Sequence, residues 1–240
     1  KKEEFFVKGV KFEMSERIPH RAVAELFKKE KKLGEDSFVE IVFMLVLGVM
    51  KKVTPQPPYY AELGHAIPSG LTAELETKVK ACVHRAIIAL GVNHGSVNMD
   101  LLITNEGNVH IVDVGARMGG NLIGSHIIPM GTGIDYMGNM IRAAVGDTTN
   151  WKPEWQPKPV ATRLLALTPG RIKKLPNFDK MAAECNVLIE HHLYVGDTIT
   201  PYRTNLDGCG YVVASNLDVN LSIEQAAEVR SLIDKSIERE

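Results

Sequence analysis

The pattern of apolar and polar positions predicts two short strands near the middle of the chain. Val97–Thr104 and Val109–Val114 are rich in apolar and β-branched residues with single polar residues between them, as in strands with one buried face. The four residues that separate them, Asn105–Asn108, have the composition of a tight turn. The simplest interpretation is a β-hairpin.

Counting back from this turn places two acidic residues opposite each other. If Thr104 faces Val109 across the loop, Asp100 faces Asp113, and their Cβ atoms lie roughly 5 Å apart on one face. Like charges in this position are destabilising unless positive charge lies between them, and a hard divalent cation is a common partner. A register shifted by one residue would instead send the two side chains to opposite faces, and both alternatives stay open.

A glycine-rich bend follows the second strand. It reads Gly115-Ala-Arg117-Met-Gly119-Gly120-Asn121. Its glycines allow the backbone to approach a ligand closely, and its arginine can bind phosphate or carboxylate with two hydrogen bonds. Two acids, an arginine and a glycine pair in this order predict a site for Mg²⁺ and phosphate.

Two helices are predicted beside the hairpin. Thr72 can cap a helix that runs to Leu90, with Gly91 just beyond its end. A second helix is predicted at Gly133–Val145, ended by Gly146. The first helix has one apolar face at helical spacing, formed by Leu75, Val79, Cys82 or Val83, Ala86 and Leu90.

The chain before residue 50 is predicted to hold strands and one surface helix. Phe5–Lys8 has the composition of a strand that ends in a lysine, and His20–Lys32 is typical of a surface helix with a narrow apolar stripe. Ser37–Val49 contains mainly apolar residues and predicts one or two buried strands.

The composition changes at Asp147–Pro159, which has two tryptophans and three prolines and is interpreted as a domain connector. A small α+β domain is expected after it. Its predicted strands are Val160–Leu167, Val187–Tyr194 and Tyr211–Ala214, and a turn is predicted at Thr168–Arg171. Its predicted helices are Asp179–Cys185 and a last helix that starts at a capping box, Ser222–Gln225, and buries Ala226, Val229, Ile233 and Ile237.

Composition and charge exclude several classes of protein. The 240 residues, 45% of them hydrophobic, are enough for a core in one or two domains. The 28 basic and 29 acidic residues nearly cancel, which argues against nucleic acid or an anionic membrane as partner. Three scattered cysteines favour a reducing compartment. Because the longest apolar run, Ile41–Met50, is too short to span a membrane and no signal peptide opens the chain, we expect a cytoplasmic protein.

The order of acid, acid, arginine and Gly-Gly resembles the nucleotide site of the ATP-grasp superfamily. The resemblance implies that Asp100 and Asp113 hold Mg²⁺ on the phosphates of ATP, and that Arg117 steadies the transferred phosphoryl group or an acyl phosphate. The commonest family pattern has Glu at the second acid and Asn two residues later, where this chain has Asp113 and Gly115. The Gly-Ala-Arg version resembles the branch that includes amino-acid ligases.

The resemblance extends to residues before the hairpin. It implies that Lys8 and Lys52 bind the phosphates of ATP. The segment Pro57–Ser69 is similar to the connector of carboxylate–amine ligases, in which a Glu-x-x-His pair approaches the active site. The C-terminal Arg171 and Arg203 could reach a substrate carboxylate. The residues expected to bind substrate are Glu62, His65, Gly119, Gly120 and Asn121.

The fold that the resemblance implies is α+β: an ATP-grasp fold with an incomplete N-terminal lobe and an antiparallel sheet with helices, followed by the small α+β C-terminal domain. We expect a partial first lobe at residues 1–50, a second lobe with the metal and phosphate site at 51–149, and the last domain at 150–240. Because no glycine-rich lid separates Lys8 from Gly9, we expect residues of the natural protein to be missing there. The same expectation applies near Leu33–Gly34, near Met44–Leu45 and upstream of Lys1.

The function that the resemblance implies is that of an ATP-dependent, ADP-forming carboxylate–amine ligase. Its cofactors would be ATP and Mg²⁺, and its substrates small carboxylates and amines such as amino acids. Two alternatives stay open: a carbamoyl-phosphate-synthase-like enzyme that phosphorylates bicarbonate or carbamate, and a non-catalytic nucleotide-binding module. A homodimer is one possible assembly, and the sequence identifies neither the substrates nor the oligomeric state.

Overall fold

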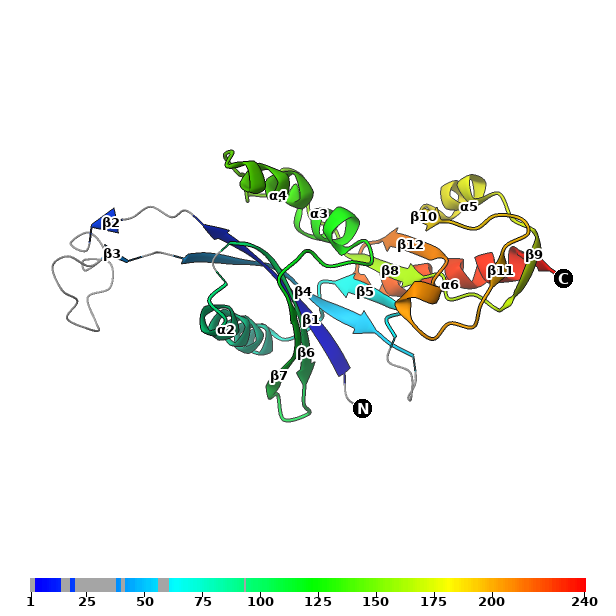
Figure 1. Ribbon diagram of the computed structural model, residues 1–240. Helices are drawn as coiled ribbons and strands as arrows, with labels where there is room; N and C mark the ends of the chain where they lie inside the picture. Colours follow the sequence, from blue (N-terminus) through cyan, green and yellow to red (C-terminus); the bar gives the residue numbers. More distant parts are fainter. Residues whose placement is uncertain (1–2, 14–17, 20–37, 40–41, 56–60, 93) are drawn as a thin grey trace.

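The structure is a computed structural model that describes residues 3–13, 18–19, 38–39, 42–55, 61–92 and 94–240, with side chains from residue 44 onward. Its centre is an eight-stranded antiparallel sheet in the order β10-β12-β8-β5-β4-β1-β6-β7 (Figure 1). The strands are β1 Glu3–Glu13, β4 Val42–Val53, β5 Gly64–Ile67, β6 Gly95–Ile103, β7 Val109–Gly115, β8 Val160–Leu164, β10 Leu188–His191 and β12 Gly210–Ser215.

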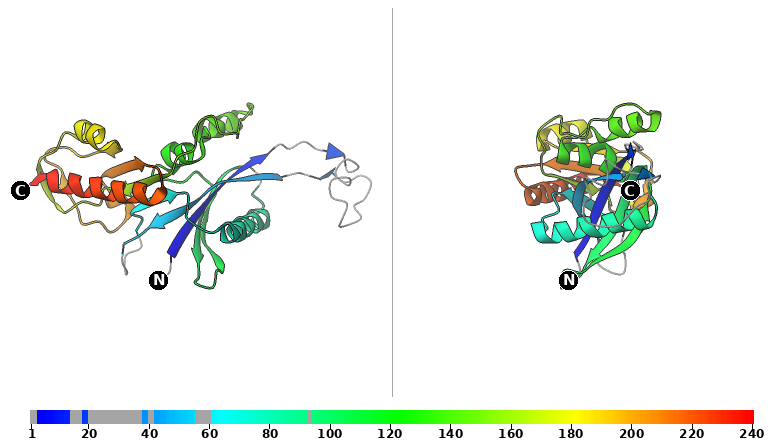
Figure 2. Two further views of the ribbon diagram at one scale, coloured as in Figure 1. Left: turned by 180° about the vertical axis from the view of Figure 1, so that it is seen from behind. Right: turned by 90° about the vertical axis from the view of Figure 1, so that its left-hand side faces the viewer.

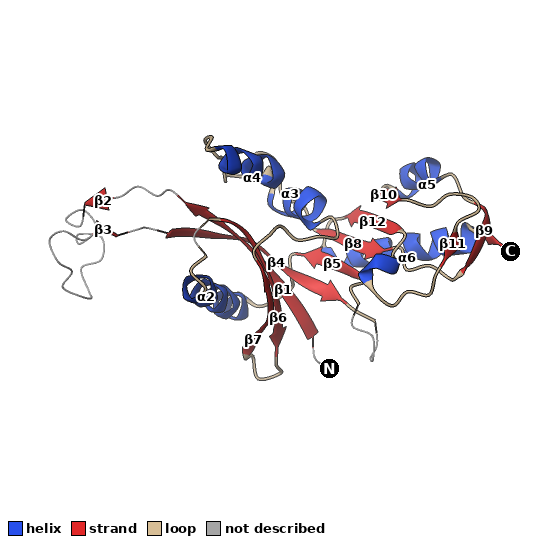
Figure 3. Ribbon diagram, viewed as in Figure 1, coloured by secondary structure: helices blue, strands red, loops and turns tan. Residues whose placement is uncertain are grey.

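Short strands and helices complete the architecture (Figure 3). The short strands form two small sheets: β2 Ile18–Pro19 with β3 Phe38–Val39, and β9 Gly170–Lys174 with β11 Thr198–Ile199 and β13 Glu238–Arg239. The α-helices of the described residues are α2 Ala73–Ala89, α3 Ile128–Thr132, α4 Tyr136–Val145, α5 Phe178–Cys185 and α6 Val219–Ser236, and a π-helix at Ile123–Ile127 leads into α3. The predicted architecture of an antiparallel sheet with helices is confirmed.

Helices cover both faces of the sheet. Helix α2 packs on one face, over a core that includes Val97, Met99 and Leu101 of β6. The π-helix, α3 and α4 pack on the other face, over Met50 of β4 and Ile67 of β5. Figures 1 and 2 show α2 and the α3–α4 pair on opposite sides of the strands. Because side chains alternate along a strand, each residue of β4, β5 and β6 can be assigned to one of these two faces.

Strand β1 joins the two halves of the long sheet. It pairs with β4 on one side and with β6 on the other. The strand continues through Lys8 and Gly9, where its pairing with β4 shifts because Leu47 has no partner. The expectation that residues are missing at this point stays a prediction, which an intact-mass measurement can test. The predicted helix His20–Lys32 lies outside the described residues.

Helix α2 begins and ends as the sequence predicts. The hydroxyl oxygen of Thr72 accepts a hydrogen bond from the backbone N–H of Leu75 at 3.3 Å, and Gly91 follows the helix with φ +63°, a conformation that favours glycine. The predicted burial of Leu90 is wrong, because this side chain is 59% exposed at the last turn. Ile87 takes its place on the buried face, one turn after Val83.

Helix α4 begins three residues later than predicted. The carboxylate of Asp135 accepts a hydrogen bond from the N–H of Gly138 at 2.9 Å and so caps the helix before Tyr136. The predicted end is confirmed, since Gly146 has φ +81° at the C-cap.

Helix α6 begins earlier than the predicted capping box. Its N-cap is Asp218, whose carboxylate accepts hydrogen bonds from the N–H groups of Asn220 and Leu221 at 2.7 and 3.0 Å. The predicted cap at Ser222 is therefore wrong, and this residue is buried inside the helix. The predicted apolar stripe is confirmed: Ala226, Val229, Ile233 and Ile237 are all buried.

The last third of the chain extends the same sheet. Strands β8, β12 and β10 continue from β5 without a break, so the eight strands come from all three of the expected segments. The division at residues 50 and 150 stays a prediction. The predicted turn Thr168–Arg171 is wrong in its second half, because β9 starts at Gly170 and pairs with β11. No helix among the described residues is long and apolar enough to cross a membrane.

Candidate functional site

The two acidic residues of the hairpin lie opposite each other, as predicted. Asp100 of β6 is the cross-strand partner of Asp113 of β7, and Asn98 is the partner of Gly115. Val97, Met99 and their odd-numbered neighbours face α2, so Asn98 and Asp100 face the other side. The acids therefore share the face of the sheet that α3 and α4 partly cover.

This pairing depends on a β-bulge that the sequence does not reveal. At the turn, Val109 pairs with Ile103 and not with Thr104, so the assumed start of the hairpin is wrong by one residue. The pairing then shifts between Asp100 and Leu101, because Val112 of β7 has no partner. The extra residue of the bulge restores the register that the acids need.

Lys52 connects the acid pair to the predicted connector. Its ammonium nitrogen lies 3.7 Å from Oδ2 of Asp100 and 3.0 Å from Oε1 of Glu62. The lysine side chain is only 10% exposed, and that of Asp100 is 25% exposed. Lys52 pairs across the strands with His65 of β5. One buried cation thus lies between an acid from the hairpin and an acid from the connector.

Four side chains surround the carboxylate of Glu62. Besides Lys52, the imidazole Nε2 of buried His65 lies 3.8 Å from Oε1. The amide of Asn121 donates a hydrogen bond to Oε2, and the amide of Asn205 donates another at 3.2 Å. Three of these neighbours, Lys52, Asn121 and Asn205, lie within hydrogen-bond distance of the carboxylate and hold it in one position.

The charge of Glu62 follows from these contacts. Burial raises the pKa of its carboxyl group, but the nearby imidazole of His65 and the ammonium of Lys52 outweigh burial and bring the pKa to about 2. Glu62 is therefore an anion at every pH near neutrality.

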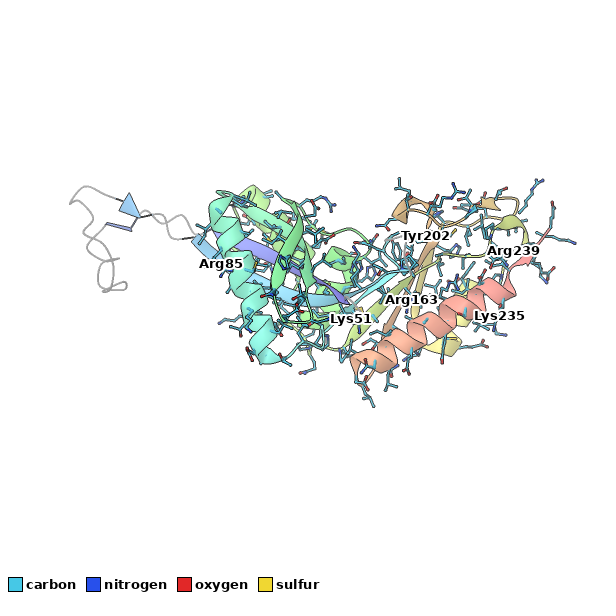
Figure 4. All side chains as sticks on the ribbon, turned by 90° about the horizontal axis from the view of Figure 1, so that it is seen from below. Lys51, Arg85, Arg163, Tyr202, Lys235 and Arg239 are labelled. Carbon is cyan, nitrogen blue, oxygen red and sulfur yellow. The ribbon has the colours of Figure 1, made fainter. Side chains whose placement is uncertain are left out.

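Residues near the end of the chain complete this network. The hydroxyl of Tyr211 donates a hydrogen bond to Oδ1 of Asn121 at 2.7 Å, and the hydroxyl of Tyr202, labelled in Figure 4, donates to the backbone oxygen of Glu62. The amide oxygen of Asn205 accepts from the N–H of Glu62 at 2.8 Å. The sequence prediction missed all three residues.

The two C-terminal arginines considered from the sequence do not contact this network. The side chain of Arg171 is 62% exposed, and its guanidinium lies 4.0 Å from the carboxylate of Glu240. Arg203 is exposed, and its backbone N–H donates to Asp207 at 3.0 Å. Its neighbours Tyr202 and Asn205 contact Glu62 instead, and their residue types alone carry no signal for this role.

The bend after β7 carries the remaining predicted residues. Arg117 is exposed, and its guanidinium donates a hydrogen bond to the backbone oxygen of Met118 at 2.9 Å. The side chain of Arg117 thus contacts the bend itself in this structure. A side chain added at Gly120 would meet no atom of the described residues within 4 Å. Gly119 precedes it in the same bend, and Asn121 follows with φ +52°, which asparagine tolerates.

The residues present fit a magnesium ion that is shared with a phosphate ligand. Magnesium typically takes one or two protein carboxylates and completes its shell with water and phosphate oxygens. Asp100 and Asp113 supply such a pair. Within the described part of the chain, no group of three or more Asp, Glu, His or Cys side chains offers a metal site of its own. Lys8 pairs with Asn98 in the backbone register, and its side chain lies outside the described residues.

Comparison with known sequences finds one relative of undefined function. No protein-family model matches the chain. The uncharacterized protein y4rH of Sinorhizobium fredii is 27% identical over 214 residues, which cover 87% of this chain and 44% of the relative. This chain therefore spans less than half the length of that protein.

Comparison with solved structures identifies the fold. The L-amino acid ligase from Bacillus licheniformis matches 99% of this chain with a TM-score of 0.74 at 18% identity, and phosphoribosylglycinamide synthetase from Anaerococcus prevotii matches 99% with a TM-score of 0.71 at 16% identity. Biotin carboxylase from Campylobacter jejuni matches the whole chain with a TM-score of 0.65 at 15% identity. The matches cover 54%, 53% and 46% of those proteins. All three are ATP-grasp enzymes, and this chain has the ATP-grasp fold.

Proposed function

We propose that the chain acts as an ATP-dependent, ADP-forming ligase that joins a carboxylate to an amine through an acyl phosphate. The observation that carries the proposal is the pair of Asp100 and Asp113 on one face of the sheet, with the buried Lys52 ammonium 3.7 Å from the first of them. The similarity in fold to an L-amino acid ligase supports this class of reaction.

The first step would transfer a phosphoryl group. A carboxylate resists attack by an amine because it is anionic and its oxygen is a poor leaving group. An oxygen of the substrate carboxylate would attack the γ-phosphorus of ATP, and the bond from that phosphorus to the β–γ bridging oxygen would break to release ADP. Mg²⁺ held by Asp100 and Asp113 would neutralise charge on the phosphate oxygens. Lys52 adds fixed positive charge beside Asp100, and Lys8 is proposed to do the same.

The second step would form the bond between carbon and nitrogen. The neutral amine would attack the acyl carbon, inorganic phosphate would leave, and the nitrogen would lose a proton. Arg117 is exposed in the bend that follows β7 and is proposed to turn onto the acyl phosphate, which a guanidinium binds with two hydrogen bonds. Such a contact typically contributes about 3 kcal/mol to the transition state.

Glu62 is proposed to position other residues. Its carboxylate already accepts hydrogen bonds from Asn121 and Asn205 and lies within 4 Å of Lys52 and His65. Because Lys52 contacts one carboxylate oxygen and Asn121 the other, Glu62 would act by holding the lysine and Asn121 in place. Substrate contacts in this region are then proposed for the bend at Gly119–Asn121.

A second candidate reaction is phosphorylation of bicarbonate. It is favoured by the match to a biotin carboxylase domain bound to bicarbonate, which covers 99% of this chain with a TM-score of 0.64. This reaction would use the same Asp100, Asp113 and Lys52 but a smaller acceptor. ADP release that needs bicarbonate and no amino acid would select this candidate.

The test is ADP release by the purified protein with ATP, Mg²⁺ and a panel of amino acids offered in pairs. The proposal predicts ADP and phosphate only when both a carboxylate and an amine are present. Asp113→Asn should lower the rate at least 100-fold, within the range that loss of one stabilising group causes. Glu106→Gln is the matched control, because Glu106 lies exposed in the turn of the same hairpin.

Two outcomes would contradict the proposal. Full activity of Asp113→Asn would remove the metal assignment. Binding of Mg-ATP with no ADP formed from any pair, or from bicarbonate, would identify a nucleotide-binding module without catalysis.

A further inference from the structure

One buried amide oxygen near the acid pair has no partner among the described residues. Asn98 is 8% exposed, and its Oδ1 makes no hydrogen bond within the described part of the structure. Nearly all buried polar atoms in folded proteins are hydrogen-bonded, and exceptions often mark a site for a ligand, water or ion. This oxygen therefore calls for an explanation.

Asn98 lies on the same face of the sheet as Asp100 and Asp113. It lies two residues before Asp100 on β6, and its cross-strand partner Gly115 lies two residues after Asp113 on β7. Residues two apart on a strand share a face, so these four positions form a square on the face toward α4. Three corners carry side-chain oxygens, and the fourth has no side chain.

The neighbouring polar residue on this face interacts with α4. Burial raises the pKa of Tyr136 in α4, and the side chain of Ser96, two residues before Asn98, opposes that rise. That interaction confirms that the even-numbered side chains of β6 face α4. On this face of β6, Asn98 therefore lies between Ser96 and Asp100.

We propose that Asn98 supplies a third oxygen to the site that binds a divalent cation with nucleotide. The inference rests on the proposed function, because it assigns a further residue to the same site. An amide oxygen is a hard, neutral donor, which magnesium and manganese accept together with carboxylates. Two aspartates and one asparagine would hold the cation without adding a third negative charge beside the phosphates.

Gly115 offers an internal test of this assignment. Among the described atoms, a side chain built there would come no closer than 3.6 Å to any neighbour, and the nearest atoms belong to Arg117. An asparagine placed at Gly115 would project from the corner opposite Asn98. The side-chain amide can thus be transferred from position 98 of β6 to position 115 of β7 without a clash at the Cβ atom.

The experiment measures binding of Mn²⁺ to the full chain in the presence of a non-hydrolysable ATP analogue, by electron paramagnetic resonance of the free ion. Asn98→Leu keeps the size of the side chain and removes its oxygen. It should weaken Mn²⁺ binding at least tenfold, as loss of residues that support metal sites does. Thermal stability without ligand should not fall, since an apolar group replaces an unpaired polar one.

Two further variants separate a ligand from a structural residue. Asn98→Asp should keep Mn²⁺ affinity within a few-fold, because it retains an oxygen at the same position. Gly115→Asn added to Asn98→Leu should recover most of the lost affinity. Ser96→Ala is the control, because it removes a buried polar group from the same face of β6 and should leave Mn²⁺ binding unchanged.

The outcomes decide between explanations. The assignment is overturned if folded Asn98→Leu binds Mn²⁺ within twofold of the natural chain. It is also overturned if Asn98→Asp loses affinity as far as Asn98→Leu does and Gly115→Asn restores nothing. If the natural chain binds no Mn²⁺ with the analogue, the proposed function fails together with the assignment of Asn98. If the natural chain binds Mn²⁺ and Asn98→Leu binds it equally well, only the assignment of Asn98 fails.

Discussion

The network around Glu62 predicts a defined dependence of stability on pH. The pKa of this carboxyl group is about 2 in the folded chain and 4.5 in the reference state. Each unit of difference corresponds to about 1.4 kcal/mol, so the ionised group contributes about 3 kcal/mol to the free energy of unfolding near neutral pH. Because the folded pKa is depressed, this contribution is complete well above pH 4.5 and is lost as the pH falls toward 2.

The assay is urea unfolding of the natural chain and of Glu62→Gln at pH 7 and pH 3. The natural chain should lose about 2 kcal/mol between these two values through Glu62 alone, since pH 3 lies between the two pKa values. Glu62→Gln cannot titrate there. The stability difference between the two proteins should therefore shrink by about 2 kcal/mol at pH 3.

An exposed glutamate provides the control. Glu224 lies on the solvent side of α6, so Glu224→Gln should follow the pH dependence of the natural chain. If Glu62→Gln shows the same loss between pH 7 and pH 3 as the natural chain, Glu62 is not the stabilised anion described above. The arrangement of Lys52 and His65 around it would then be wrong.

Two other substitutions follow from single contacts. Lys52→Met leaves Glu62 and Asp100 without the cation between them, and breaking a buried ion pair typically costs 3–5 kcal/mol. Urea unfolding should show a loss of about this size, and a loss below 1 kcal/mol would contradict the buried pair. Thr72→Ala removes the cap of α2 and should cost about 1 kcal/mol in thermal unfolding, while the neighbouring exposed Thr77→Ala serves as control.

The acid pair shows how far the sequence alone can lead. The pairing of Asp100 with Asp113 is confirmed, although the assumed partner of Val109 is not. Without the bulge at Val112, the register at the turn would have placed the acids on opposite faces. Bulges depend on how the finished sheet twists, and the valine at position 112 gives no sequence signal for one.

The local sequence signals predicted where α2 and α4 end, but they did not predict the residue at which α6 begins. Gly91 and Gly146 end α2 and α4 as expected, because a left-handed cap favours glycine. Asp218 was missed as the N-cap of α6, since Ser222 with Gln225 has the pattern of a capping box but lies one turn inside the helix. Both segments can cap a helix, and the packing of the first turn decides between them.

The Glu62 network was predictable only in part. Lys52, Glu62, His65 and Asn121 were each proposed from a resemblance, and the structure brings them together. Their partners in the last third of the chain were not predicted, because contacts such as Tyr211 to Asn121 span 90 residues. Only the three-dimensional arrangement of β12 beside the bend reveals them.

The most direct test of the central claim is calorimetric titration of the chain with ATP, with Mg²⁺ and with a chelator in its place. If Asp100 and Asp113 hold a cation against the phosphates, ATP should bind at least tenfold more tightly with Mg²⁺, and Asp100→Asn should abolish that difference. Equal affinity in both conditions, or an undiminished Mg²⁺ effect in Asp100→Asn, would contradict the claim.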